Sequence, residues 1–87
     1  MRIEGKLIKR TYTLSSAVAE NNDSTLSYTE RLERCLLGLC KELGIPVPLW
    51  LEKNTREFVR FKRTFFFNEQ FEEKVGFDRF EIRVIGE

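Results

Sequence analysis

The chain has 87 residues, of which 41% are hydrophobic, and its 15 basic and 14 acidic side chains leave a net charge of +1. This balance is typical of a folded domain rather than a disordered tail, and the length allows one domain, 1–87, while excluding large catalytic scaffolds such as α/β barrels. Histidine is absent, which excludes Ser-His and Cys-His nucleophile pairs within the chain.

The first predicted elements are two strands, over residues 2–9 and 11–19, in which apolar side chains recur at even spacing. We expect the two strands to pair as a hairpin, although the turn between them contains neither Gly nor Asn. A polar loop over residues 20–25 follows.

The sequence next predicts an amphipathic helix over about 27–43. Ser27 and Glu30 form an S-x-x-E capping box at its start, and Gly44 followed by Pro46 ends it. Its apolar side chains recur with helical spacing on one face: Leu32, Cys35, Leu36, Leu39, Cys40 and Leu43.

The only two cysteines, Cys35 and Cys40, lie about 140° apart on this helix at ~100° per residue, which is a poor arrangement for a disulfide. We expect them to be small buried residues in a reducing compartment. The charged residues at positions 1–6 do not resemble a signal peptide, and no stretch approaches the ~20 apolar residues of a membrane span. The sequence therefore predicts a cytoplasmic protein with no membrane contact.

The second half begins with an apolar connector over residues 45–51, which two prolines keep extended. A short helix is predicted over 55–61, with Asn54 as its N-cap and with Phe58 and Phe61 on its inner face.

Residues 63–67, R-T-F-F-F, form a predicted strand with aromatic side chains on both faces. Such a strand is either central in its sheet or meets another element or another chain with one face. A polar helical turn over 68–74 and a strongly alternating strand over 78–85 complete the prediction. The expected fold class is α+β, with a small antiparallel sheet of three to four strands packed on one long amphipathic helix, plus a short second helix.

Aromatic side chains are the first candidate functional feature. We predict an interaction surface formed by Trp50, Phe65, Phe66 and Phe67, because tryptophan is over-represented among binding hot spots. The alternative for Trp50 is packing over the end of the helix. The expected function is that of a non-catalytic protein-interaction module with an unidentified protein partner, and one form of it is a homodimer.

Basic residues indicate an alternative function, the binding of single-stranded nucleic acid. Residues 45–63 carry five basic and two acidic side chains, and within the segment 53–67 the basic residues alternate with phenylalanines. Single-strand binding proteins combine cations for phosphates with aromatic rings for bases, so Arg56, Arg60, Lys62 and Arg63 are candidate nucleic-acid contacts. The competing interpretation is a solvated helix face, which the low net charge favours.

Acidic residues dominate the end of the chain, where residues 64–87 include Glu69, Glu72, Glu73, Asp78 and Glu81. Their spacing enforces neither an acid–base pair nor a metal site, and the glycines are isolated. We therefore expect no enzyme, no catalytic residue, no cofactor and no metal.

Four segments carry a resemblance to a known family: M-R-I-E-G-K-L-I-K at 1–9, C-K-E-L-G at 40–44, P-L-W-L-E-K-N-T-R-E-F-V-R-F at 48–61, and F-D-R-F-E-I-R-V-I at 77–85. With them the chain resembles a family of short, uncharacterised cytosolic proteins from Gram-positive anaerobic bacteria. The resemblance covers most of the chain. It implies a compact bacterial cytosolic protein and transfers no functional residue to this sequence.

Overall fold

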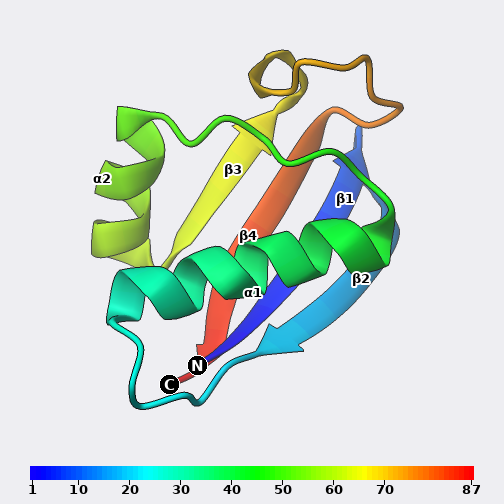
Figure 1. Cartoon of the computed structure of the whole chain (residues 1–87). Coiled ribbons are helices and arrows are strands. Elements are labelled where there is room, and N and C mark those ends of the chain that lie inside the picture. The colour runs from blue at the N-terminus through cyan, green and yellow to red at the C-terminus, as the bar shows by residue number, and fades with distance from the viewer.

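Four strands and two helices make up the structure, a computed structural model that describes all 87 residues. In chain order these are β1 (Arg2–Lys9), β2 (Tyr12–Glu20), α1 (Tyr28–Leu43), α2 (Glu52–Phe61), β3 (Arg63–Phe67) and β4 (Arg79–Gly86), with a 3₁₀ turn at Asn68–Gln70. The strands form one antiparallel sheet in the order β2-β1-β4-β3. Helix α1 crosses one face of this sheet and α2 stands beside β3 (Figure 1).

The predicted α+β class is confirmed, including a four-stranded antiparallel sheet and a second helix. Helix α1 has 16 residues, so it is a helix of ordinary length and not the long one expected. Neither helix combines the length and the apolar character that crossing a membrane requires.

The capping box predicted for α1 is present. The Ser27 hydroxyl accepts a hydrogen bond from the Glu30 N–H at 3.2 Å, and the Glu30 carboxylate accepts one from the Ser27 N–H at 3.0 Å. At the other end Gly44 adopts the left-handed conformation, with φ 68°, which a residue without a side chain adopts readily. Residues close in sequence therefore determine where α1 begins and where it ends.

The β1–β2 hairpin turns at residues 10 and 11 without a glycine. Arg10 takes the positive φ of 56°, and its N–H donates a hydrogen bond to the carboxylate of Asp78. A contact from the far end of the chain thus stabilises a turn that carries a weak local signal. Near this turn the register of the hairpin shifts: Ile8 pairs with Thr13, whereas Leu7 pairs with Ser15. Leu14 is therefore the extra residue of a β-bulge in β2.

The core lies between α1 and the covered face of the sheet. Gly5 of β1 allows the close approach of the two layers, since a Cβ there would lie 2.9 Å from Phe80 Cε1 and 3.3 Å from Leu39 Cδ1. The largest fully buried apolar side chains come from all layers: Ile3, Leu39, Phe66, Phe80 and Ile82.

Two expectations for the second half need correction. Helix α2 begins at Glu52, so Asn54 lies inside its first turn and is not the N-cap; its side chain accepts a hydrogen bond from the Leu51 N–H. Phe58 is buried as expected, but Phe61 is 59% exposed because α2 covers only the edge of the sheet. Strand β3 lies at the edge of the sheet and packs against α2, so of the two alternatives left open for this strand the contact with another element is found and the central position is not.

Candidate functional site

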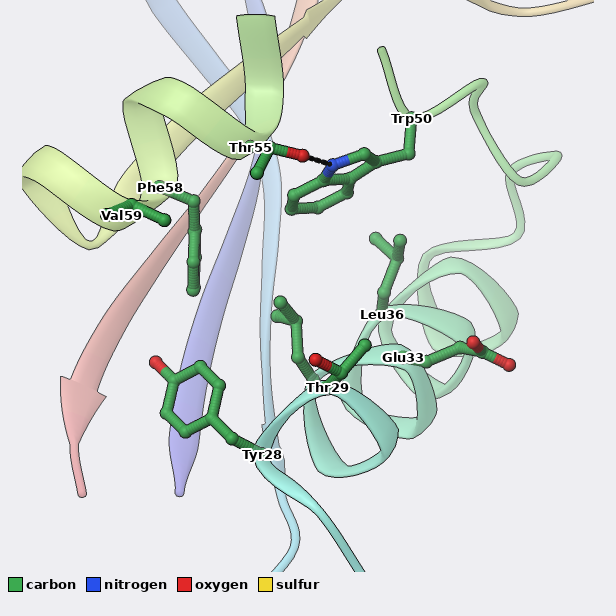
Figure 2. A pocket seen from close by; sticks show the side chains of 9 residues that line it. Tyr28, Thr29, Glu33, Leu36, Trp50, Thr55, Phe58 and Val59 are labelled. Atoms are coloured by element: carbon green, nitrogen blue, oxygen red, sulfur yellow. Dashed lines mark hydrogen bonds between the residues drawn. The ribbon is translucent and has the colours of Figure 1, made fainter. Parts of the chain in front are cut away.

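A groove of about 420 Å³ runs between α1 and α2 (Figure 2). Tyr28, Leu32 and Leu36 contribute its α1 wall, and their i, i+4, i+8 spacing places them along one flank of the helix. Most of the lining is apolar, and the full set is Tyr28, Thr29, Leu32, Glu33, Leu36, Trp50, Thr55, Phe58 and Val59. The groove is therefore a concave apolar surface between two helices.

Trp50 occupies a fixed position in this groove. The centroid of its ring lies 6.0 Å from that of Phe58, in an edge-on geometry, and 5.6 Å from that of Phe66, in a tilted geometry. The indole Nε1–H donates a hydrogen bond of 2.7 Å to Thr55 Oγ1 (Figure 2). The ring is half-buried, so one part of it belongs to the core and the remainder lines the groove.

A buried polar cluster, formed by Asn54, Thr64 and Gln70, holds the backbone next to Trp50. Asn54 Nδ2 donates to Thr64 Oγ1 at 2.7 Å, and Gln70 Nε2 donates to Asn54 Oδ1 at 3.0 Å. Gln70 also donates to the carbonyl of Leu49, while Asn54 accepts from the N–H of Leu51. The cluster thus holds the backbone on both sides of Trp50, and no buried side-chain polar atom is left without a partner.

The exposed wall of the groove carries Val59, which is 74% exposed on α2. At the Tyr28 end, Lys62 Nζ lies 3.4 Å from the Tyr28 hydroxyl and 5.0 Å from the centre of its ring. Glu33 lines the α1 side. An apolar floor is therefore bordered by one cationic and one anionic side chain.

The three consecutive phenylalanines are divided between the two faces of the sheet. Phe66 is fully buried beside Phe80, so it belongs to the core and must be removed from the predicted interaction surface. Phe65 and Phe67 point to the opposite face, where their rings stack at 6.4 Å. The reason is the two-residue period of a strand, which sends alternate side chains to opposite faces.

The four candidate nucleic-acid contacts are dispersed. Arg56 pairs with Glu52 at 3.2 Å on α2, and the Arg60 guanidinium lies 5.4 Å from the Phe61 ring. Lys62 reaches the Tyr28 end of the groove instead. These three do not share one contact network.

Of the four, only Arg63 lies beside the stacked pair Phe65 and Phe67. Its guanidinium is 5.6 Å from the centre of the Phe65 ring and 3.8 Å from Glu81. Lys53 begins the predicted basic segment 53–67 but is not among the four predicted contacts, and its Nζ is 4.4 Å from the centre of the Phe67 ring.

The remaining candidate groups are separated or buried. No three of the Cys, Asp and Glu side chains come together in a way that could hold a metal ion. Cys35 and Cys40 are free and buried, as predicted. Burial raises the pKa of both thiols, that of Cys40 to about 11, which keeps it in the unreactive thiol form at neutral pH.

Comparison with protein-family models, with curated proteins and with solved structures finds no match for this chain. The family resemblance described from the sequence stays a prediction. The groove and its geometry are accordingly the basis for a functional proposal.

Proposed function

We propose that the chain is a non-catalytic protein-interaction module, whose groove between α1 and α2 receives apolar side chains of a partner protein. The observation that carries this proposal is the half-buried Trp50 in a concave apolar groove of about 420 Å³. Apolar concave surfaces and anchored tryptophans are typical of binding sites.

Preorganisation favours this function. Trp50 is held by two ring contacts, the bond to Thr55 and the polar cluster behind it, so binding need not order its side chain. Ordering a mobile side chain at an interface costs about 0.5–1.5 kcal/mol. Burying one Leu or Phe side chain of a partner contributes roughly 1.5–3 kcal/mol, so a few such anchors suffice for measurable affinity.

Photo-crosslinking in the native cell tests the proposal. A benzophenone amino acid replaces Val59 on the groove wall, and the matched control carries it in place of Leu37, a 45% exposed residue of α1 that is not part of the groove. We expect a specific crosslinked protein from position 59 that is absent from position 37. Equal crosslinking from both positions, or none from position 59, contradicts the proposal.

Single-stranded nucleic-acid binding is the second candidate, and one observation favours it. The stacked rings of Phe65 and Phe67 lie on the sheet face opposite the core, with a cation near each, Arg63 and Lys53. Aromatic rings on a sheet can stack on bases while cations contact phosphates.

Fluorescence anisotropy with a labelled single-stranded oligonucleotide measures this second function. Binding that weakens steeply with salt and is lost in Phe67→Ala and Lys53→Glu supports it. Binding that neither substitution changes, or no binding at low salt, excludes this surface.

A further inference from the structure

The outer edge of β2 presents backbone groups that form no hydrogen bond with any other part of the chain. Met1 and Asn21 exchange two hydrogen bonds, from the Met1 amino group to the Asn21 carbonyl at 3.1 Å and from the Asn21 N–H to the Met1 carbonyl at 2.9 Å. Because hydrogen-bonded pairs alternate along an antiparallel ladder, Ala19, Ala17 and Ser15 also face β1. The N–H and C=O groups of Ser16, Val18 and Glu20 therefore point away from the sheet, where no strand follows.

The opposite edge of the sheet is protected. On β3, the Phe65 carbonyl accepts a hydrogen bond from Asn54 Nδ2, and the Phe67 N–H donates one to Gln70 Oε1. Helix α2 stands beside this strand (Figure 1). The two edges of one sheet thus differ, since side chains bond two backbone groups of the β3 edge and no side chain bonds the outward backbone groups of β2.

The open edge has the properties of a pairing surface. Proteins use prolines and charged side chains to block edge strands, and β2 has no proline and a single charged side chain, Glu20, at its end. The bulge at Leu14 lies near the hairpin turn, so the register with β1 is regular from Ser15 to Glu20. An uninterrupted edge whose one charged side chain lies at its end accepts another strand readily.

We infer that β2 pairs with β2 of a second copy of this chain, antiparallel about a two-fold axis at Val18. This register places Val18 opposite Val18 of the second copy, and Ser16 opposite Glu20 in both directions. Each of the three hydrogen-bonded pairs exchanges two bonds, about six in all. The two sheets become one of eight strands, within the usual size range.

Self-complementarity is the reason for choosing a second copy as the partner. The strand offers a β-branched side chain at the axis, and the register places its one carboxylate, Glu20, opposite a hydroxyl instead of another carboxylate. The inference is independent of the proposed groove function. Variants of β2 and variants of the groove therefore test separate claims.

Sedimentation velocity over a concentration series tests the inference on the whole chain. We expect a reversible dimer with a dissociation constant in the micromolar range, because an edge contact of this size is small for a protein interface. Val18→Lys places two like charges together at the axis and raises the dissociation constant roughly tenfold or more. Tyr12→Lys is the control, because it adds the same charge to β2 outside the paired stretch.

Two charge substitutions at Ser16 test the register. Ser16→Lys faces Glu20 of the second copy and strengthens the dimer roughly 2- to 10-fold, whereas Ser16→Glu weakens it by a similar factor. Within one chain Ser16 lies opposite Lys6, so Ser16→Glu does not harm the monomer. A weaker dimer in that variant cannot be explained by poorer folding.

Thiol crosslinking gives a covalent test of the axis. The Cβ atoms of a hydrogen-bonded antiparallel pair lie about 5.5 Å apart, which exceeds the roughly 3.5–4.5 Å of a disulfide, so a short bismaleimide reagent crosslinks Val18→Cys and does not crosslink Tyr12→Cys. Both native cysteines are buried and do not compete. A wild-type chain that stays monomeric up to about 1 mM, or a dimer that Val18→Lys and Tyr12→Lys weaken equally, overturns the inference.

Discussion

Gln70 and Asn54 are joined in the interior by a hydrogen bond of 3.0 Å, although 16 residues separate them in the sequence. The same two side chains bond two backbone groups on the outer edge of β3 and hold the connector on either side of Trp50. One polar contact between distant residues thus both closes the β3 edge of the sheet and fixes the position of the groove.

Removing Asn54 should therefore destabilise the whole fold. Asn54→Ala leaves Gln70, Thr64 and the Phe65 carbonyl short of partners in a buried position, and we expect the free energy of unfolding to fall by roughly 2–4 kcal/mol. Urea denaturation measures this change. Asn68→Ala is the control at an exposed asparagine, with an expected effect within about 0.5 kcal/mol, and similar losses in both variants would argue against the cluster.

Local signals predicted those parts of the fold whose contacts are close in sequence. The capping box at Ser27 and the glycine at position 44 gave the ends of α1, and the alternation of residues 78–85 gave β4. The start of α2 was misplaced because Asn54 resembles an N-cap in sequence, whereas its side chain is drawn inward by Thr64 and Gln70.

The groove could be predicted only in part. Trp50 was identified from its residue type, but its partners on α1 and α2 depend on how two helices approach each other, which no local pattern reports. The spacing of Tyr28, Leu32 and Leu36 was the available signal for the α1 wall. Phe66 is part of the core and not of the predicted interaction surface, because the sequence of three identical residues does not indicate which of them faces the core.

Two glycine substitutions should have opposite effects. Gly5→Ala forces its new methyl against Phe80 and Leu39, and we expect a loss of about 1–3 kcal/mol. Gly38→Ala meets only Ala19 Cβ at 4.0 Å, so the better helix propensity stabilises the chain by about 0.5–1 kcal/mol. Thermal unfolding of both variants measures the difference, and a loss in Gly38→Ala would show that α1 lies closer to β2 than described.

Acid should weaken the start of α1. The Ser27 backbone N–H, and then the Ser27 side chain, lower the pKa of Glu30 below its usual 4.5. A carboxyl whose pKa is lower in the folded state contributes stability that is complete above the unfolded pKa and is lost as the pH falls through the folded one. Glu30→Gln should therefore lose less stability than wild type between pH 5 and pH 2 (approximate limits). Identical acid profiles for the two proteins would contradict this role of Glu30.

Thiol labelling should report unfolding. Both thiols are buried, and the pKa of Cys40 is raised to about 11, so the folded chain should react slowly with an aromatic disulfide reagent at neutral pH. Denaturant concentrations that unfold the chain should restore the rate of an ordinary thiol. Rapid labelling of the folded chain would show that α1 opens locally without global unfolding.

The emission of Trp50, the only tryptophan, tests the central claim most directly because the indole lines the groove itself. The measurement is a titration of the purified chain with the partner protein that is crosslinked through position 59. We predict a saturable blue shift with one partner per groove, a dissociation constant raised roughly tenfold or more by Val59→Glu, and no change with Leu37→Glu. Binding that leaves the Trp50 emission unaltered, or that both substitutions weaken alike, would contradict the claim that this groove is the binding site.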